Sequence, residues 1–177
     1  MFKTYGHLIG SLKMSSTASL RKFQFFPLVI NLLITLAVGF VAMFFTRPQI
    51  AGWYSTLKKP SFNPPPQVFA PVWIGLYILI AIAAYLVWKH RSRKPVYKVT
   101  RAIYFIQLFL NGSWSIVFFG LHEIFGALVV IILLWISIIL TIQWFNKFNK
   151  MAGWLLWPYL LWVSFAGVLN ASIYFLN

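Results

Sequence analysis

The chain of 177 residues is 61% hydrophobic, and only 9% of its residues are charged. Since about a quarter of the residues in an average soluble domain are charged, this composition predicts a protein that lies in a lipid bilayer. The chain has one acidic residue and no cysteine, which excludes paired-carboxylate catalysis, disulfides and cysteine nucleophiles.

The first 22 residues form a basic segment that is rich in serine and threonine and contains no acid. This composition suits a solvated tail, a transit peptide, or a stretch preceding a true start at Met14. We favour a basic N-terminal tail over residues 1–22, followed by a single membrane domain over residues 23–177.

Five runs without charged residues or histidine follow, and each holds about the 20 apolar residues that a helix needs to cross a bilayer. Hydrocarbon satisfies no backbone polar group, and the runs lack the alternation of barrel strands. The sequence therefore predicts an all-α integral membrane protein, a single bundle of five transmembrane helices. The expected spans are 24–45, 68–88, 102–121, 124–145 and 152–175.

The connection between the first two spans, residues 46–67, is rich in proline. Proline holds the residue before it in an extended conformation, so this segment is stiff. We expect it to fold back over the bundle as a lid on a cavity, with Pro71 in the first turn of the second span. The alternative is a rigid connector whose aromatic rings lie at the membrane interface.

Basic residues are distributed unequally between the two ends of such a bundle. With five spans, all of them except Arg47, Lys58 and Lys59 fall on the side of the N-terminus. The positive-inside rule then predicts that the N-terminus is inside and the C-terminus outside. The charge is expected to contact anionic lipid, not nucleic acid. A bacterial inner membrane is the expected location, and an organelle membrane is the alternative.

Few residues offer catalytic or metal chemistry. Glu123 is the only acid and opens the fourth span, where it suits the helix dipole. His7, His90 and His122 fall in the tail or in loops, which disfavours a haem ligand deep in the bundle. No phosphate loop, serine elbow or cluster with metal-ligand spacing is present, so we expect no metal site.

Tryptophan and amide side chains inside the spans are the remaining candidates. Indole rings suit a flat, mostly apolar ligand, although any single ring can instead serve packing or interfacial anchoring. Lys58 and Lys59, at the mouth of the bundle, could pair with carboxylates of such a ligand. Asn111 and Asn170 are informative, because an amide buried in lipid needs a partner across helices or in a cavity.

Three blocks carry a specific resemblance: WYSTLKKPSFNPPPQVFAPVWIGLY at 53–77, LNGSWSIVFFG at 110–120 and PYLLWVSFAGVLNASIYFLN at 158–177. They resemble signature motifs of the TspO and translocator protein family, also called the peripheral-type benzodiazepine receptor (TspO/MBR) family. The resemblance extends in order over roughly residues 45–177. Phe62 stands where the family's lid usually has tryptophan, which keeps a ring face and loses an N–H donor.

The resemblance implies a five-helix bundle, usually a homodimer, with a pocket at the loop side for porphyrins and other flat aromatic ligands. The residues at matching positions that would line this pocket, under a lid formed by 53–67, are Tyr54, Trp73, Asn111, Trp114, Trp162 and Ala166. The sterol pattern of the C-terminal helix is broken here, which disfavours sterol transport.

The leading interpretation is a membrane protein that binds porphyrin, such as protoporphyrin IX or a haem-like pigment, as a non-covalent ligand and senses, sequesters or transports it. One alternative is a photo-oxidase that degrades porphyrin in light, for which Trp73 and Trp162 are the matching positions. The other is a regulatory membrane scaffold. We expect no enzymatic activity in the leading interpretation. For a homodimer seam, Gly167 and Ala171 form a small-residue pair.

Overall fold

The computed structural model describes residues 23–91 and 94–177, and this part contains helices and no strand. Five helical segments are long and apolar enough to cross a membrane, which confirms the predicted class of fold. The predicted tail, residues 1–22, lies outside the described residues. The elements are α1 (Phe25–Ile50), α2 (Trp53–Thr56), α3 (Pro66–Trp88), α4 (Lys94–Ser115), the π-helical turn η1 (Ile116–Gly120), α5 (Ile124–Asn146), α6 (Lys150–Trp154) and α7 (Trp157–Leu176).

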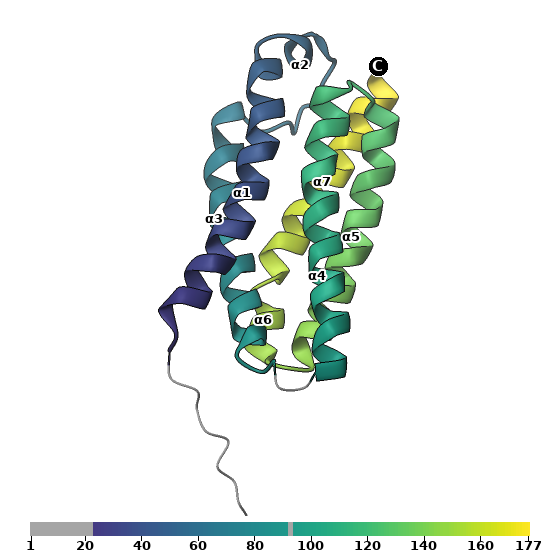
Figure 1. Cartoon of the computed structure of the whole chain (residues 1–177). Helices are drawn as coiled ribbons and strands as arrows, with labels where there is room; N and C mark the ends of the chain where they lie inside the picture. Colours follow the sequence, from purple (N-terminus) through teal and green to yellow (C-terminus); the bar gives the residue numbers. More distant parts are fainter. Residues whose placement is uncertain (1–22, 92–93) are drawn as a thin grey trace, which may run out of the picture.

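The helices form a closed ring in which α1 packs against α3 and α4, and α5 lies between α4 and α7. Contacts from α3 to α6 and α7 complete the ring. Figure 1 shows α2 and the C-terminus at one end of the bundle, and the start of α1 and α6 at the other. The proline-rich connection and the end of α7 therefore meet at one end, which we call the lid end.

Two helices extend beyond the predicted spans. The first continues to Ile50 instead of ending at 45, and the third begins at Lys94 instead of 102. The hydrocarbon limits the length of the apolar run, but water satisfies the backbone beyond it, so a helix can continue with polar residues. Apolar length alone therefore sets the core of each span and not its ends.

Prolines shape the second and fifth spans. Since α3 begins at Pro66, Pro71 lies in the second turn and not in the first. Its missing N–H leaves the carbonyl of the exposed Gln67 without a helical partner, and water can take that place. The fifth span is divided into α6 and α7, and Pro158 lies in the first turn of α7, where its lack of an N–H costs nothing.

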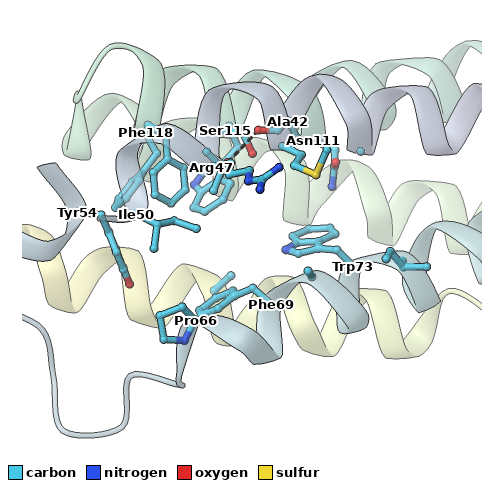
Figure 2. Close-up of a pocket in the computed structure, with 18 of the residues that line it drawn as sticks. Ala42, Arg47, Ile50, Tyr54, Pro66, Phe69, Trp73, Asn111, Ser115 and Phe118 are labelled. Carbon is cyan, nitrogen blue, oxygen red and sulfur yellow. Dashed lines mark hydrogen bonds between the residues drawn. The ribbon is translucent and has the colours of Figure 1, made fainter. Parts of the chain in front are cut away.

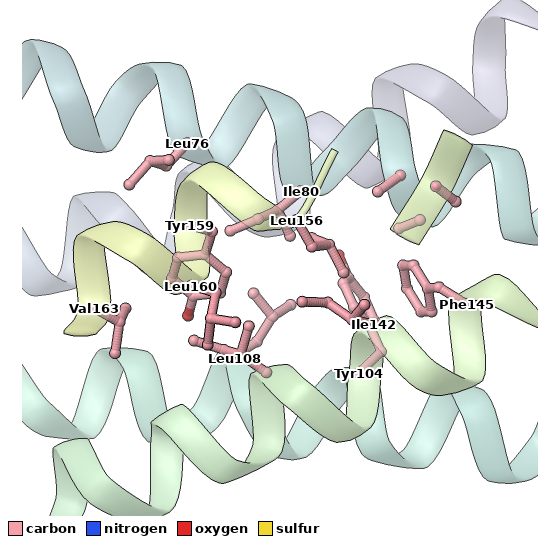
Figure 3. Packing of buried hydrophobic residues seen from close by; sticks show 14 of the residues in the cluster. Leu76, Ile80, Tyr104, Leu108, Ile142, Phe145, Leu156, Tyr159, Leu160 and Val163 are labelled. Atoms are coloured by element: carbon pink, nitrogen blue, oxygen red, sulfur yellow. The ribbon is translucent and has the colours of Figure 1, made fainter. Parts of the chain in front are cut away.

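A continuous hydrophobic core fills the half of the bundle away from the lid end. Figure 3 shows Ile80 of α3, Leu108 of α4, Ile142 and Phe145 of α5 and Tyr159 of α7 packed together there. Ile80 is fully buried, and Phe145 and Tyr159 are each 1% exposed. The cavity described below lies beyond this packed region, at the lid end.

Candidate ligand-binding cavity

A cavity of about 540 Å³ lies at the lid end, with walls from α1, α3, α4, η1 and α7 and with α2 closing it. Among the residues predicted for the site, those that line it are Tyr54, Trp73, Asn111, Trp114 and Ala166. In Figure 2, the rings of Tyr54, Trp73 and Phe118 face the same space. Most of the wall is apolar or aromatic.

The other four predicted residues do not line the cavity, namely Lys58, Lys59, Phe62 and Trp162. The indole of Trp162 is half-buried and lies edge-on to Phe69, with ring centroids 5.9 Å apart. Phe69 lines the cavity, whereas Trp162 does not. The structure thus assigns this wall position to Phe69.

A chain of hydrogen bonds forms the floor of the cavity. The hydroxyl of Tyr77 donates to Oδ1 of Asn111 over 2.7 Å, and Nδ2 of Asn111 donates to the hydroxyl of Tyr159 over 2.9 Å. Tyr159 in turn donates to Oε1 of Gln107 over 3.1 Å. The buried amide of Asn111 thus has partners across two helices, as expected for an amide in lipid. Its polar atoms hold α3, α4 and α7 together at this level.

A second set of hydrogen bonds fixes the aromatic wall. Nε1 of Trp114 donates to Oδ1 of Asn170 over 3.0 Å, and Nδ2 of Asn170 donates to the backbone oxygen of Ile124 over 3.0 Å. The indole also stacks on Phe118, with centroids 5.4 Å apart and planes at 23°. One face of Trp114 and its N–H are therefore occupied by protein, which fixes the orientation of the ring in the wall.

Tyr54 closes the lid end from inside. Its side chain is buried, and its hydroxyl donates to Oδ1 of Asn63 over 2.9 Å, which ties α2 to the proline-rich connection. Burial raises the pKa of Tyr54 above its usual value of 10, and the hydrogen bond to Asn63 opposes that rise. Nζ of Lys59 lies 4.8 Å from the centroid of the same ring, and Lys59 itself does not line the cavity. The phenol is therefore neutral at physiological pH.

Several contacts fasten the lid, residues 51–65, to the rest of the bundle. The side-chain amide of Asn177 accepts from the backbone N–H of Lys58 over 2.9 Å and donates to its carbonyl over 3.0 Å. The indole of Trp53 stacks on His122 at 4.3 Å, and Phe62 lies edge-on to a phenylalanine ring of α7 at 6.3 Å. These contacts hold residues 51–65 against α7 and the turn before α5.

The open side of the cavity lies between α1 and α3. All exposed residues of the lining come from these two helices: Leu36, Phe40, Met43 and Arg47 on α1, and Pro66, Ala70 and Ile74 on α3. Below this opening the two helices approach closely: Gly39 of α1 faces the ring of Tyr77 of α3, and a Cβ atom on Gly39 would overlap that ring. The cavity is thus covered at the lid end and open at the side that faces the surrounding lipid.

The sequence interpretation gave no role in the site to Arg47 and Ser115, which are polar residues of the lining. Arg47 reaches into the cavity from the last turn of α1, and Ser115 is 6% exposed on the opposite wall. Neither side chain has a hydrogen-bond partner in the described part of the chain. Ser115 follows Asn111 by one helical turn and so shares its face, a signal that could have identified it.

The dimensions and lining of the cavity are those of a site for a small molecule. Within residues 23–91 and 94–177, no group of three or more His, Asp or Glu residues could hold a metal ion. The cavity volume falls within the range of about 300–1,000 Å³ that is typical of small-molecule sites. Its rings offer apolar faces to a flat ligand, and its few unpaired polar groups can orient that ligand.

Comparison with known proteins agrees with this architecture. The sequence profile of the TspO/MBR family matches residues 31–176. A tryptophan-rich protein TspO from Archaeoglobus fulgidus is 44% identical over 150 residues, covering 85% of this chain and 96% of the relative. A protein of the same name from Chlorobaculum tepidum is 44% identical over 154 residues, covering 87% and 98%. The human translocator protein is 36% identical over 139 residues, covering 76% and 80%. This chain therefore belongs to the TspO/MBR family.

Proposed function

We propose that this membrane protein binds a porphyrin or a similar flat tetrapyrrole in the cavity at the lid end, without converting it chemically. The observation that carries the proposal is the cavity of about 540 Å³ with aromatic walls under a fastened lid. Through such binding the protein would sense, sequester or transport the pigment. The name of the human relative, translocator protein, is in keeping with a transport role.

The shape of the wall supports a flat ligand. Trp114 is held in place by Asn170 and Phe118, so its free face is presented without loss of side-chain freedom on binding. Trp73 stacks on Tyr77 with centroids 5.6 Å apart and lies on the opposite helix wall. Two indoles on different helices line the cavity, and each can offer a ring face to a planar molecule.

The proposed setting follows from charge. In the described part of the chain, the end opposite the lid carries most of the basic residues, including Lys98, Arg101, Lys147 and Lys150. We propose that this end faces the inside of a bacterial inner membrane and that the lid end faces outward. The proposed partners are the bilayer, the pigment and a second copy of this chain.

The test is a titration of the purified protein in neutral detergent with protoporphyrin IX in the dark, followed by quenching of tryptophan fluorescence. Saturable quenching at micromolar concentration is expected. Ala42→Phe places a ring inside the cavity and should abolish this quenching, whereas Ala37→Phe adds the same ring to an exposed position on the same helix and should preserve it. Equal binding by both variants would reject the cavity as the site.

Illumination of the same samples tests the photo-oxidase alternative. The position of Trp73 in the cavity lining supports this alternative. A stable pigment spectrum supports binding alone. Loss of the pigment bands faster than for free porphyrin, prevented by Trp73→Phe, would replace binding with degradation as the function. A cellular phenotype that survives Ala42→Phe would instead favour the scaffold.

A further inference from the structure

Arg47 holds the one charge in the cavity wall. Among the described residues of the lining, no other is charged, and no acidic side chain accompanies it. The chain's single acid, Glu123, is exposed in the turn before α5 and does not line the cavity. The guanidinium therefore has its five N–H donors available toward the open space.

The position of Arg47 on α1 explains why a charge is tolerated there. Leu36, Phe40, Met43 and Arg47 recur every three or four residues, so they form one stripe along the open side of the cavity. Arg47 is at the lid end of this stripe, one turn before α1 ends at Ile50. A cation is costly at the centre of a bilayer but not near its surface, so the stripe is apolar in depth and cationic at its outer end.

The two lysines predicted to meet a ligand carboxylate are placed differently. Nζ of Lys59 donates to the backbone oxygens of Leu57 at 3.0 Å and Ser55 at 3.4 Å, and it faces the ring of Tyr54. Lys58 is exposed, and its backbone is held by Asn177. Neither lysine lines the cavity, so among the described residues Arg47 is the cation of the lining.

We propose that Arg47 binds a carboxylate of the ligand and so makes the cavity selective for amphipathic acids over their neutral esters. This inference rests on the proposed function and names the chemical class of its ligand. A guanidinium pairs with a carboxylate through two parallel hydrogen bonds, and the pair strengthens in apolar surroundings. The hydroxyl of Ser115, also unpaired and in the wall, is a second donor to the same end of the ligand.

The geometry gives the ligand an orientation. Its acidic edge lies at the lid end beside Arg47, and its apolar body extends toward Trp73 and the floor at Asn111. This arrangement matches a molecule held at a membrane surface, where the acid stays near water and the rings enter the apolar space. The opening between α1 and α3 runs in the same direction as the proposed ligand, from the lid end toward the floor.

The experiment compares protoporphyrin IX with its dimethyl ester, both titrated in the dark against the purified full chain in neutral detergent. Arg47→Gln is expected to weaken binding of the diacid about tenfold or more and to leave binding of the ester unchanged. Lys98→Gln removes the same charge from an exposed position at the opposite end and should bind both ligands as the unmodified protein does.

Other outcomes reject the inference. Unchanged binding of the diacid by Arg47→Gln would mean that Arg47 serves a lipid phosphate, and an equal loss for both ligands would mean that it serves packing. If Lys58→Gln or Lys59→Gln loses diacid binding and Arg47→Gln does not, a lysine of the lid and not Arg47 binds the ligand carboxylate. If the unmodified protein binds neither pigment saturably, the proposed function itself fails.

Discussion

Nε1 of Trp114 on α4 lies 3.0 Å from Oδ1 of Asn170 on α7, and this hydrogen bond spans two walls of the cavity. The same asparagine is held by the backbone oxygen of Ile124, so three helices are fixed relative to one another by a single amide. Without this partner, only ring contacts such as the stack on Phe118 would fix the orientation of the indole. The aromatic wall thus depends on a polar contact between two residues of the lining.

Trp114→Phe should therefore weaken both the fold and the site. It keeps most of the ring but leaves Oδ1 of Asn170 unpaired, which should lower the free energy of unfolding by about 0.6–1.7 kcal/mol. Trp135→Phe is the matched control, since it also removes an indole N–H that has a partner. This N–H donates to the hydroxyl of Ser164 over 2.8 Å, and neither residue lines the cavity. Thermal unfolding in detergent should shift in both variants, whereas porphyrin affinity should fall in Trp114→Phe alone. Equal affinities would show that the bond does not orient the wall.

The close approach of α1 and α3 gives a second prediction. A Cβ atom on Gly39 overlaps the ring of Tyr77, which donates to Asn111 in the floor. Gly39→Ala should lower the free energy of unfolding by about 1–3 kcal/mol through overpacking. Gly75→Ala, where nothing lies within 4 Å of the new atom, should raise it by about 0.5–1 kcal/mol, because alanine favours a helix. Equal unfolding temperatures for the two variants would contradict this account.

The fold was predictable because its main determinant is a one-dimensional pattern. Five apolar runs must cross the bilayer as helices, whatever their neighbours are. The helix ends were less predictable, as the early start at Lys94 shows, because polar residues continue a helix once water is available. The division between α6 and α7 was also missed, since no break in apolar composition marks it.

The site was harder to predict, because its residues depend on how each helix is rotated about its axis. An apolar pattern on all sides does not specify which face turns inward, so it could not separate a cavity residue from a lipid-facing one. The family motif placed Trp162 in the pocket, yet in this structure Phe69 takes that wall. For Arg47, the sequence predicted only the side of the membrane on which it lies. That its side chain points into the cavity is seen only in the structure.

The fastening of the lid gives a third prediction. Asn177→Ala removes two hydrogen bonds to the backbone of Lys58, each worth about 0.5–1.5 kcal/mol, so amides of the lid should exchange with deuterium roughly tenfold faster or more. Ser172→Ala removes a hydroxyl that bonds only within α7, to the oxygen of Val168, and should leave that exchange unchanged. Mass spectrometry of peptides covering residues 51–65 measures both. Equal protection in the two variants would show that Trp53 and Phe62 suffice to hold the lid.

The last prediction concerns Trp162, whose Nε1 is buried without a hydrogen-bond partner in the described part of the chain. A buried donor without a partner lowers the stability of the folded protein. Removing it therefore offsets part of the stability that is lost because the smaller ring packs less well. Trp162→Phe should therefore change the free energy of unfolding by less than about 1 kcal/mol, in contrast to Trp135→Phe, whose donor has a partner.

Porphyrin affinity completes this test. Because Trp73 lines the cavity and Trp162 does not, Trp162→Phe should bind protoporphyrin IX as the unmodified protein does, while Trp73→Phe should bind it more weakly. Fluorescence titration of the two variants in parallel provides the measurement. A loss of affinity in Trp162→Phe as large as that in Trp73→Phe would place both indoles against the ligand.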